Sequence, residues 1–188
     1  AYKEFFEISL QLVNIVKNLH EIGFYHFQIN SNNILIDPES LDLHLIDFCN
    51  VSSGSFNGRQ DLLSWGKELE YITPEQTGRE RSISDGRSDL YSMGIVFYEL
   101  LTGNTPFHEF KELDLIHSHL VRKPIVLTKA LPDIPIALAA IIAKLLNKNP
   151  RDRYQSVSGL EYDLIQCQKF FTSGDTNNNL GLGSQDRP

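Results

Sequence analysis

Two stretches of the sequence gather polar side chains that could carry chemistry. The first, residues 24–35, reads Phe-Tyr-His-Phe-Gln-Ile-Asn-Ser-Asn-Asn-Ile-Leu, and Asp47 follows fourteen residues after Asn33. The amide of Asn33 and the carboxylate of Asp47 carry hard oxygen atoms, which are the ligands that Mg²⁺ prefers. Gln28 carries an amide that neither takes up a proton nor bears a negative charge, so it cannot act as a base.

Helices are the main elements predicted around these stretches. Apolar residues recur at helical spacing over residues 3–20, which predicts an amphipathic helix. Short apolar runs at 34–36 and 43–46 predict a β-hairpin, and residues 50–66, polar and without periodicity, predict an exposed loop. Further helices are predicted at 89–102, 112–121, 136–147 and 156–171.

Composition places the chain among globular proteins with one core. It has 188 residues, 41% of them hydrophobic and 22% charged. The net charge of -7 argues against a nucleic acid or an anionic membrane as partner. Because no apolar run approaches the roughly 18 residues of a spanning helix, and the first residues lack a signal-peptide layout, we expect a cytoplasmic protein without a membrane segment. Cys49 and Cys167 are too few and too far apart for a disulfide framework or a zinc site.

The two polar stretches resemble the signature of a protein kinase, in which a catalytic loop H-R-D-L-x-x-x-N precedes D-F-G. Further fragments follow in the same order: 71–75 resembles the A-P-E region, 87–94 the start of the buried helix of the large lobe, and 149–154 the motif near the end of the domain. The resemblance implies a mainly α fold, the C-terminal lobe of a kinase-like domain with a small β-hairpin and no N-terminal lobe. Its expected parts are the lobe (1–171), the catalytic loop (24–35), the metal-binding motif (47–49), the activation segment (47–75) and the helical subdomain (85–171).

The resemblance also implies roles for single residues. Asn33 and Asp47 are expected to bind ATP and Mg²⁺, the cofactors of phosphoryl transfer. Three catalytic-loop residues belong to the candidate catalytic site: Gln28 at the place of the catalytic base, His26, which holds the loop, and Asn30, where most Ser/Thr kinases have lysine.

Three further residues are expected to have structural roles. The resemblance implies an interior ion pair between Glu75 and Arg153 that locks the activation segment to the lobe. Asp89 is expected to cap the first turn of the buried helix and to accept hydrogen bonds from the catalytic-loop backbone.

Departures from the kinase pattern cluster at the catalytic loop. Gln28 replaces the catalytic aspartate, Phe27 replaces an arginine, and Glu68 is near the place of a threonine that usually contacts that aspartate. General-base assistance contributes roughly 10²–10⁴-fold to a rate, so Gln28 alone predicts severe impairment. The sequence also lacks a Gly-rich loop and the lysine and glutamate that pair behind it, so we expect this chain alone not to phosphorylate a substrate. Cys49 stands in place of the D-F-G glycine.

A narrower resemblance is to the kinase domain at the head of large multi-domain hybrid sensor histidine kinases. It rests on Asn30 and on residues 71–79, 97–103, 115–119 and 152–156. In that family an ATPase-like region follows, and 182–188 resembles the connecting stretch. Residues 172–188 are therefore predicted to be a flexible linker toward a further domain.

Three interpretations of function stay open at this point. The first is an impaired Ser/Thr kinase-like domain of a signalling protein, whose partners are a missing N-lobe, the downstream domains and a protein substrate or signalling partner. The second is a nucleotide-responsive pseudokinase module without transferase activity, and the related alternative is a kinase that becomes active with its N-lobe. The third is a truncated gene product, which would expose apolar surface near Ile34, Leu45 and Phe48.

Overall fold

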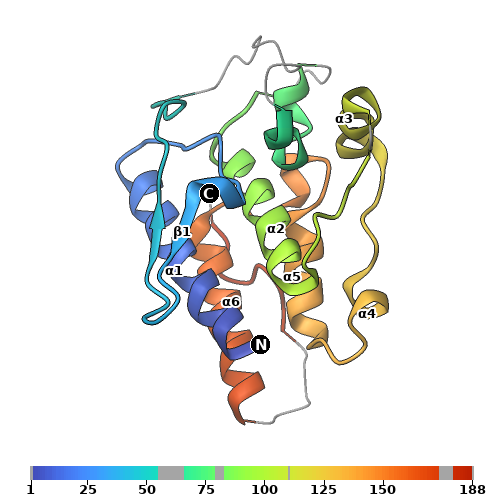
Figure 1. Cartoon of the computed structure of the whole chain (residues 1–188). Helices are drawn as coiled ribbons and strands as arrows, with labels where there is room; N and C mark the ends of the chain where they lie inside the picture. The colour runs from blue at the N-terminus through green and yellow to red at the C-terminus, as the bar shows by residue number, and fades with distance from the viewer. Residues whose placement is uncertain (1, 55–65, 79–82, 110, 174–179, 188) are drawn as a thin grey trace.

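A computed structural model describes residues 2–54, 66–78, 83–109, 111–173 and 180–187, and is mainly helical with one small sheet (Figure 1). The helices are α1 (Tyr2–Glu21), α2 (Gly86–Thr102), α3 (Glu112–Val121), α4 (Leu127–Ala130), α5 (Ile136–Leu145) and α6 (Val157–Ser173). Short 3₁₀ helices are η1 (Ser31–Asn33), η3 (Gly66–Tyr71), η4 (Glu75–Thr77) and η5 (Pro150–Asp152), and the strands are β1 (Ile34–Ile36) and β2 (Leu43–Leu45). The predicted fold class, a mainly α lobe with a β-hairpin, is confirmed.

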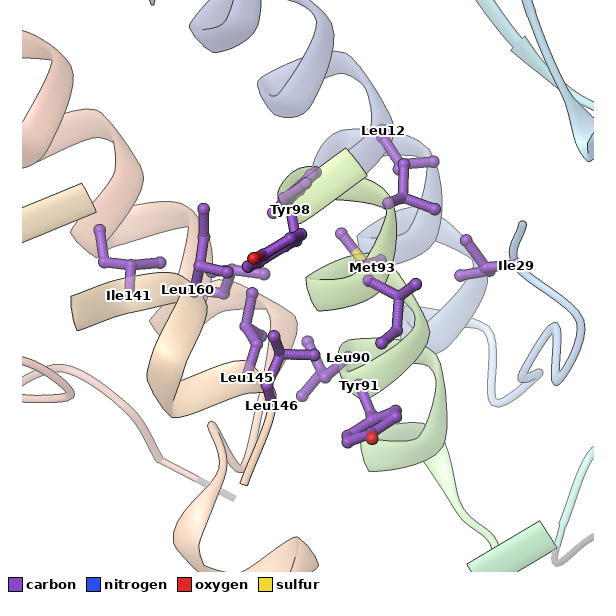
Figure 2. Packing of buried hydrophobic residues seen from close by; sticks show 14 of the residues in the cluster. Leu12, Ile29, Leu90, Tyr91, Met93, Tyr98, Ile141, Leu145, Leu146 and Leu160 are labelled. Carbon is purple, nitrogen blue, oxygen red and sulfur yellow. The ribbon is translucent and has the colours of Figure 1, made fainter. Parts of the chain in front are cut away.

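Helix α2 forms the centre of the lobe, with the β-hairpin on one side and α3 and α4 on the other (Figure 1). Its residues from Ser88 to Tyr98 are buried, as the apolar pattern of this segment predicts. Figure 2 shows Leu90 of α2 beside Leu145, the last residue of α5, and Leu146, which follows it. Gly94 permits this close packing, because a Cβ atom there would lie 2.8 Å from the Cβ atom of Leu145.

Helix α1 covers the hairpin side of α2 and also packs against α6. Its apolar face packs into the core, with Phe6, Leu12 and Val16 all at 0% exposure. The polar side chain of Gln11 ties α1 to the hairpin, since it donates to the carbonyl of Leu41 (2.9 Å) and accepts from the amide of Leu43 (3.0 Å). Thus one helix positions both the core and the strands that follow the catalytic loop.

The hairpin pairs β1 and β2 antiparallel, with Ile34 opposite Leu45 and Ile36 opposite Leu43. Leu43 and Leu45 are buried, whereas Leu35 on β1 is exposed, as expected for a sheet with one covered face. The predicted hairpin is confirmed, although its second strand ends at Leu45, one residue before the predicted end.

The other helix predictions hold with small shifts of their ends. Helix α2 starts three residues before the predicted start, because Asp85 caps it by accepting a hydrogen bond from the amide of Arg87 (2.9 Å). The sequence suggested Asp89 as this cap, which is wrong. Helix α5 ends at Leu145, and the short α4 was not predicted. None of the helices in the described residues is long and apolar enough to cross a membrane.

The predicted exposed loop lies partly outside the described residues, at 55–65. Its first residues are held to the catalytic loop, because Ser52 and Tyr25 exchange two backbone hydrogen bonds of 3.1 and 3.0 Å. This pairing places the segment after Asp47 alongside the start of the catalytic loop.

The prediction of a flexible linker over 172–188 is wrong for the described residues at its two ends. Helix α6 continues to Ser173, and Leu180 and Leu182 pack against the core. The carboxylate of Asp186 accepts hydrogen bonds from the backbone amides of Gln155 (2.8 Å) and Ser156 (2.9 Å), just before α6 begins. Residues 180–187 are held at the start of α6, because Asp186 satisfies backbone amides that have no partner within the helix.

Candidate functional site

Asp89 holds the backbone of the catalytic loop. It projects from α2 and is fully buried. Its carboxylate accepts hydrogen bonds from the backbone amides of His26 (2.8 Å) and Phe27 (2.7 Å). The same carboxylate lies 2.8 Å from Nε2 of His20 on α1. Two of these contacts hold the loop backbone and the third ties Asp89 to α1, and Phe27 takes a left-handed φ of 60° in the loop.

The polar side chains of the loop hold its end through local hydrogen bonds. The side-chain oxygen of Asn30 caps η1 by accepting from the amides of Asn32 (2.9 Å) and Asn33 (3.2 Å). The side-chain amide nitrogens of Asn30 and Asn33 both donate to the carbonyl of Gln28, at 3.0 Å each. Since the nitrogen of Asn33 is used in this way, its side-chain oxygen is the atom that fits a cation.

Asp47 follows strand β2 and is exposed at the same end of the lobe. The amide of Ile46 donates to the carbonyl of Asn33 (2.9 Å), which places the residue before Asp47 against η1. Asp47 has a left-handed φ of 61°, and its carboxylate accepts from the amide of Cys49 (3.3 Å). A side-chain hydrogen bond between the Cys49 thiol and Asp47, together with the charge of Asp47, raises the pKa of that thiol.

The donor pair of Asn33 and Asp47 fits Mg²⁺, which is commonly bound through one or two carboxylates, with phosphate oxygens and water completing the octahedron. Within the described residues there is no group of three or more His, Cys, Asp or Glu side chains that could hold a metal ion without such help. The residues present are therefore suited to a metal that arrives with a phosphate ligand.

The ring of His26 is buried beneath this end of the lobe. Its centroid lies 5.1 Å from that of Phe48, the residue after Asp47. Burial lowers the pKa of His26, so a neutral ring is favoured. The ring of His26 thus packs the catalytic loop against the segment that carries Asp47.

Gln28 is engaged at both ends of its side-chain amide. Its Nε2 donates to the carboxylate of Glu68, which belongs to η3, and its Oε1 accepts from Nδ2 of Asn50. Glu68 was noted in the sequence as a departure from the kinase pattern. Asn50 was missed, because nothing in its sequence neighbourhood marks a residue three positions after Asp47 as a partner of Gln28.

Glu75 and Arg153 form a buried, two-pronged ion pair with side-chain exposures of 1% and 0%. The two guanidinium nitrogens lie 2.7 and 2.8 Å from the two carboxylate oxygens. Ser88 of α2 also donates to Glu75 (2.8 Å), and Arg153 donates to the carbonyl of Asn147 (2.7 Å). The pair thus joins η4 to α2 and to the segment before α6.

A family model described as the protein kinase domain matches residues 2–165, so the chain belongs to the protein kinase domain family. Among its relatives, hybrid signal transduction histidine kinase G of Dictyostelium discoideum is 50% identical over half of this chain and 3% of its own length. Histidine protein kinase 1 of Candida albicans is 32% identical over 95% of this chain and 8% of its own length. Serine/threonine-protein kinase PknB of Mycobacterium leprae is 33% identical over 78% of this chain and 23% of its own length.

These relatives are of two kinds, histidine kinases that include a kinase-domain-like region and Ser/Thr kinases. The chain spans less than a quarter of the length of each of the three. The predicted membership of the kinase family, with likeness to hybrid histidine kinases, is therefore confirmed.

Proposed function

We propose that this chain is the C-terminal lobe of a Ser/Thr-kinase-like domain in a cytoplasmic, multi-domain signalling protein of the hybrid sensor type. In this proposal the domain binds ATP with Mg²⁺ and transfers the γ-phosphoryl group slowly to a protein hydroxyl. The observation that carries the proposal is the contrast within one loop. The cation ligands Asn33 and Asp47 are kept, whereas an amide, Gln28, takes the place of the catalytic carboxylate.

The way the lobe holds its loops supports the proposal, because phosphoryl transfer depends mainly on correct positioning. Asp89 holds the backbone of the catalytic loop, and the ion pair of Glu75 with Arg153 holds the end of the activation segment. The residues that position a phosphate-bound Mg²⁺ are therefore supported by buried hydrogen bonds. Within the catalytic loop, the removal of the hydroxyl proton lacks its usual carboxylate at position 28.

A small lobe is the expected partner on the face that carries Asp47. Leu35, Ile46 and Phe48 are 52%, 38% and 51% exposed at this end of the lobe, although their side chains are apolar. Neighbouring exposed apolar residues mark a surface that another element covers. In the proposal, an N-terminal lobe that supplies a Gly-rich loop and a lysine covers this face and encloses the nucleotide.

The test is phosphoryl transfer from radiolabelled ATP with Mg²⁺ by this chain extended upstream to include the proposed small lobe. We expect weak transfer that disappears in Asp47→Ala. A double variant, Gln28→Asp with Glu68→Thr, returns the carboxylate to position 28 and is expected to transfer faster than the natural protein. The double change is needed because an aspartate at position 28 would otherwise face the carboxylate of Glu68.

A second candidate function is a nucleotide-responsive pseudokinase module. It is favoured by the closed arrangement of Gln28, whose amide is occupied by Glu68 on one side and by Asn50 on the other. Nucleotide binding without transfer, in both the natural protein and the double variant, would establish this candidate and overturn slow transfer. Neither nucleotide binding nor transfer by the extended chain would overturn both.

A further inference from the structure

The contact between Gln28 and Glu68 joins two departures from the kinase pattern that lie 40 residues apart in the chain. Position 28 has an amide where the pattern has a carboxylate, and Glu68 has a carboxylate near the place where the pattern has a threonine. The two side chains are hydrogen bonded, so the site keeps one carboxylate. That carboxylate projects from η3 instead of from the catalytic loop.

The direction of this hydrogen bond leaves the carboxylate chemically suited to take a proton. Asn50 donates to the oxygen of Gln28, so the amide nitrogen of Gln28 faces Glu68 and donates to it. A carboxylate has about four lone-pair positions, and this contact uses one. Gln28 therefore orients Glu68 without occupying its full capacity as an acceptor.

Helix η3 holds Glu68 on a fixed support. The next residue, Leu69, is fully buried, and Tyr71 donates from its hydroxyl to Glu99 of α2 (2.6 Å). A group that transfers a proton must be held close to the productive position, which such packing provides. Glu68 itself is half-buried, so a substrate hydroxyl can reach it.

Other carboxylates close to this region are committed elsewhere. Asp89 is fully buried against the backbone amides of the catalytic loop. Asp47 is the proposed metal ligand, and Glu70, also on η3, accepts from the hydroxyl of Thr105 (2.9 Å). Among the residues that the structure describes, Glu68 is the carboxylate hydrogen bonded to the residue at the base position.

We infer that Glu68 is the catalytic base of this domain, in place of the aspartate missing at position 28, and that Gln28 is its positioning residue. The inference rests on the proposed function. The proton of the substrate hydroxyl passes to the carboxylate of Glu68, and the hydroxyl oxygen forms a bond to the γ-phosphorus of ATP. The bond from that phosphorus to the bridging oxygen breaks, and ADP leaves with the electron pair.

The central variant is Glu68→Gln in the same upstream-extended chain. Its side-chain oxygen still accepts from Gln28, but it cannot take a proton. We expect turnover to fall by roughly 10²–10⁴-fold, with the affinity for ATP and Mg²⁺ changed by less than about twofold. Glu70→Gln removes a carboxylate from the same 3₁₀ helix and is the matched control, expected to keep its turnover.

A second measurement is independent of turnover. The side-chain amide resonances of Gln28, followed by NMR in the unextended chain, report the hydrogen bond to Glu68. They are expected to move in Glu68→Ala and to stay in place in Glu70→Gln.

A third measurement uses turnover. In Glu68→Ala, added formate is expected to restore part of the turnover, which a purely structural role of Glu68 would not produce.

The outcomes separate this inference from the proposed function. Equal turnover of the natural protein and Glu68→Gln overturns the role of Glu68 and leaves slow transfer intact. A silent natural protein with an active Gln28→Asp, Glu68→Thr double variant also overturns it, since Glu68 then fails to replace the aspartate. If neither protein transfers phosphate, both the inference and the proposed function are wrong.

Discussion

Two carboxylates of this lobe, Glu75 and Glu68, have opposite surroundings. Glu75 is buried, faces the guanidinium of Arg153 through two hydrogen bonds and also accepts from Ser88. Glu68 is half-buried and accepts from the uncharged amide of Gln28. The first carboxylate is matched by an opposite charge, whereas the second is oriented by an amide.

This difference distinguishes a carboxylate that stabilises the fold, Glu75, from one that is proposed to take part in the reaction, Glu68. A buried ion pair with satisfied hydrogen bonds keeps one geometry, because losing either partner leaves a charge without compensation. A half-buried carboxylate held by one neutral donor adds little to stability but stays accessible. The residues that hold the activation segment keep the kinase pattern, while the proposed site of proton removal departs from it.

The largest expected effect on stability is that of Arg153→Ala. It leaves Glu75 buried without its cation and removes the donors to neighbouring carbonyls, so the free energy of unfolding is expected to fall by about 3–5 kcal/mol. Urea unfolding followed by circular dichroism measures this change. Arg151→Ala, an exposed arginine of η5, is the control. Equal stability of the two variants would contradict the distinction between the two carboxylates.

Stability is also expected to depend on pH through His119. Burial, together with the charge of Lys148, lowers the pKa of His119 to about 3, and its Nδ1 lies 3.2 Å from the hydroxyl of Tyr91. The folded state keeps this ring neutral while the unfolded chain takes up a proton below its ordinary pKa of 6.5. The contribution of His119 to the free energy of unfolding is therefore fully present above pH 6.5. As the pH falls toward 3, the free energy of unfolding decreases through this group by up to about 1.4 kcal/mol per pH unit.

Urea unfolding at a series of pH values measures this dependence. Replacing His119 by Gln is expected to flatten it, whereas His117→Gln, two residues away and exposed, is expected to leave it unchanged. His26 contributes in the same direction, since burial lowers its pKa as well. A His119→Gln slope equal to that of the natural protein would show that this ring is not the titrating group.

A smaller effect is expected for Asp186→Ala at the start of α6. This variant removes the acceptor for the amides of Gln155 and Ser156, so it is expected to lose about 1 kcal/mol, as for other capping residues. Thermal unfolding measures the change, with the exposed Gln185→Ala as control. Equal melting temperatures of the two variants would mean that the carboxylate does not hold residues 180–187 in solution.

The smallest expected change in stability is that of Glu68→Gln. One hydrogen bond between a carboxylate and an amide becomes one between two amides, so the free energy of unfolding is expected to change by less than about 1 kcal/mol. The same urea series measures it. A loss as large as that of Arg153→Ala would place Glu68 in the scaffold and remove the contrast with Glu75.

Much of the lobe could be predicted from local sequence. Apolar spacing located α1, α2, α3 and α6 within a few residues, because a helix buries one face at a period that its own residues display. The short runs around Asp37 and Pro38 predicted the hairpin for a similar reason. The order of the kinase-like fragments indicated the family, which the comparison with known proteins bears out.

Other features depended on contacts between distant residues. The polar composition of residues 172–188 predicts a linker, and only the packing of Leu180 and the hydrogen bonds of Asp186 reveal that residues 180–187 dock on the lobe. The sequence indicated Asp89 as the cap of α2, but the helix begins earlier and Asp85 caps it. Asp89 holds the backbone of the catalytic loop, as the resemblance implied.

The sequence by itself determined that position 28 has no base and that Asn33 and Asp47 remain, since these are properties of side chains at recognisable places in a motif. Only the tertiary structure decided which carboxylate meets Gln28, because the path of the chain brings η3 against the catalytic loop. The physical reason is range: helical periodicity is a property of neighbouring residues, whereas a hydrogen bond between residues 28 and 68 exists only after the lobe has folded.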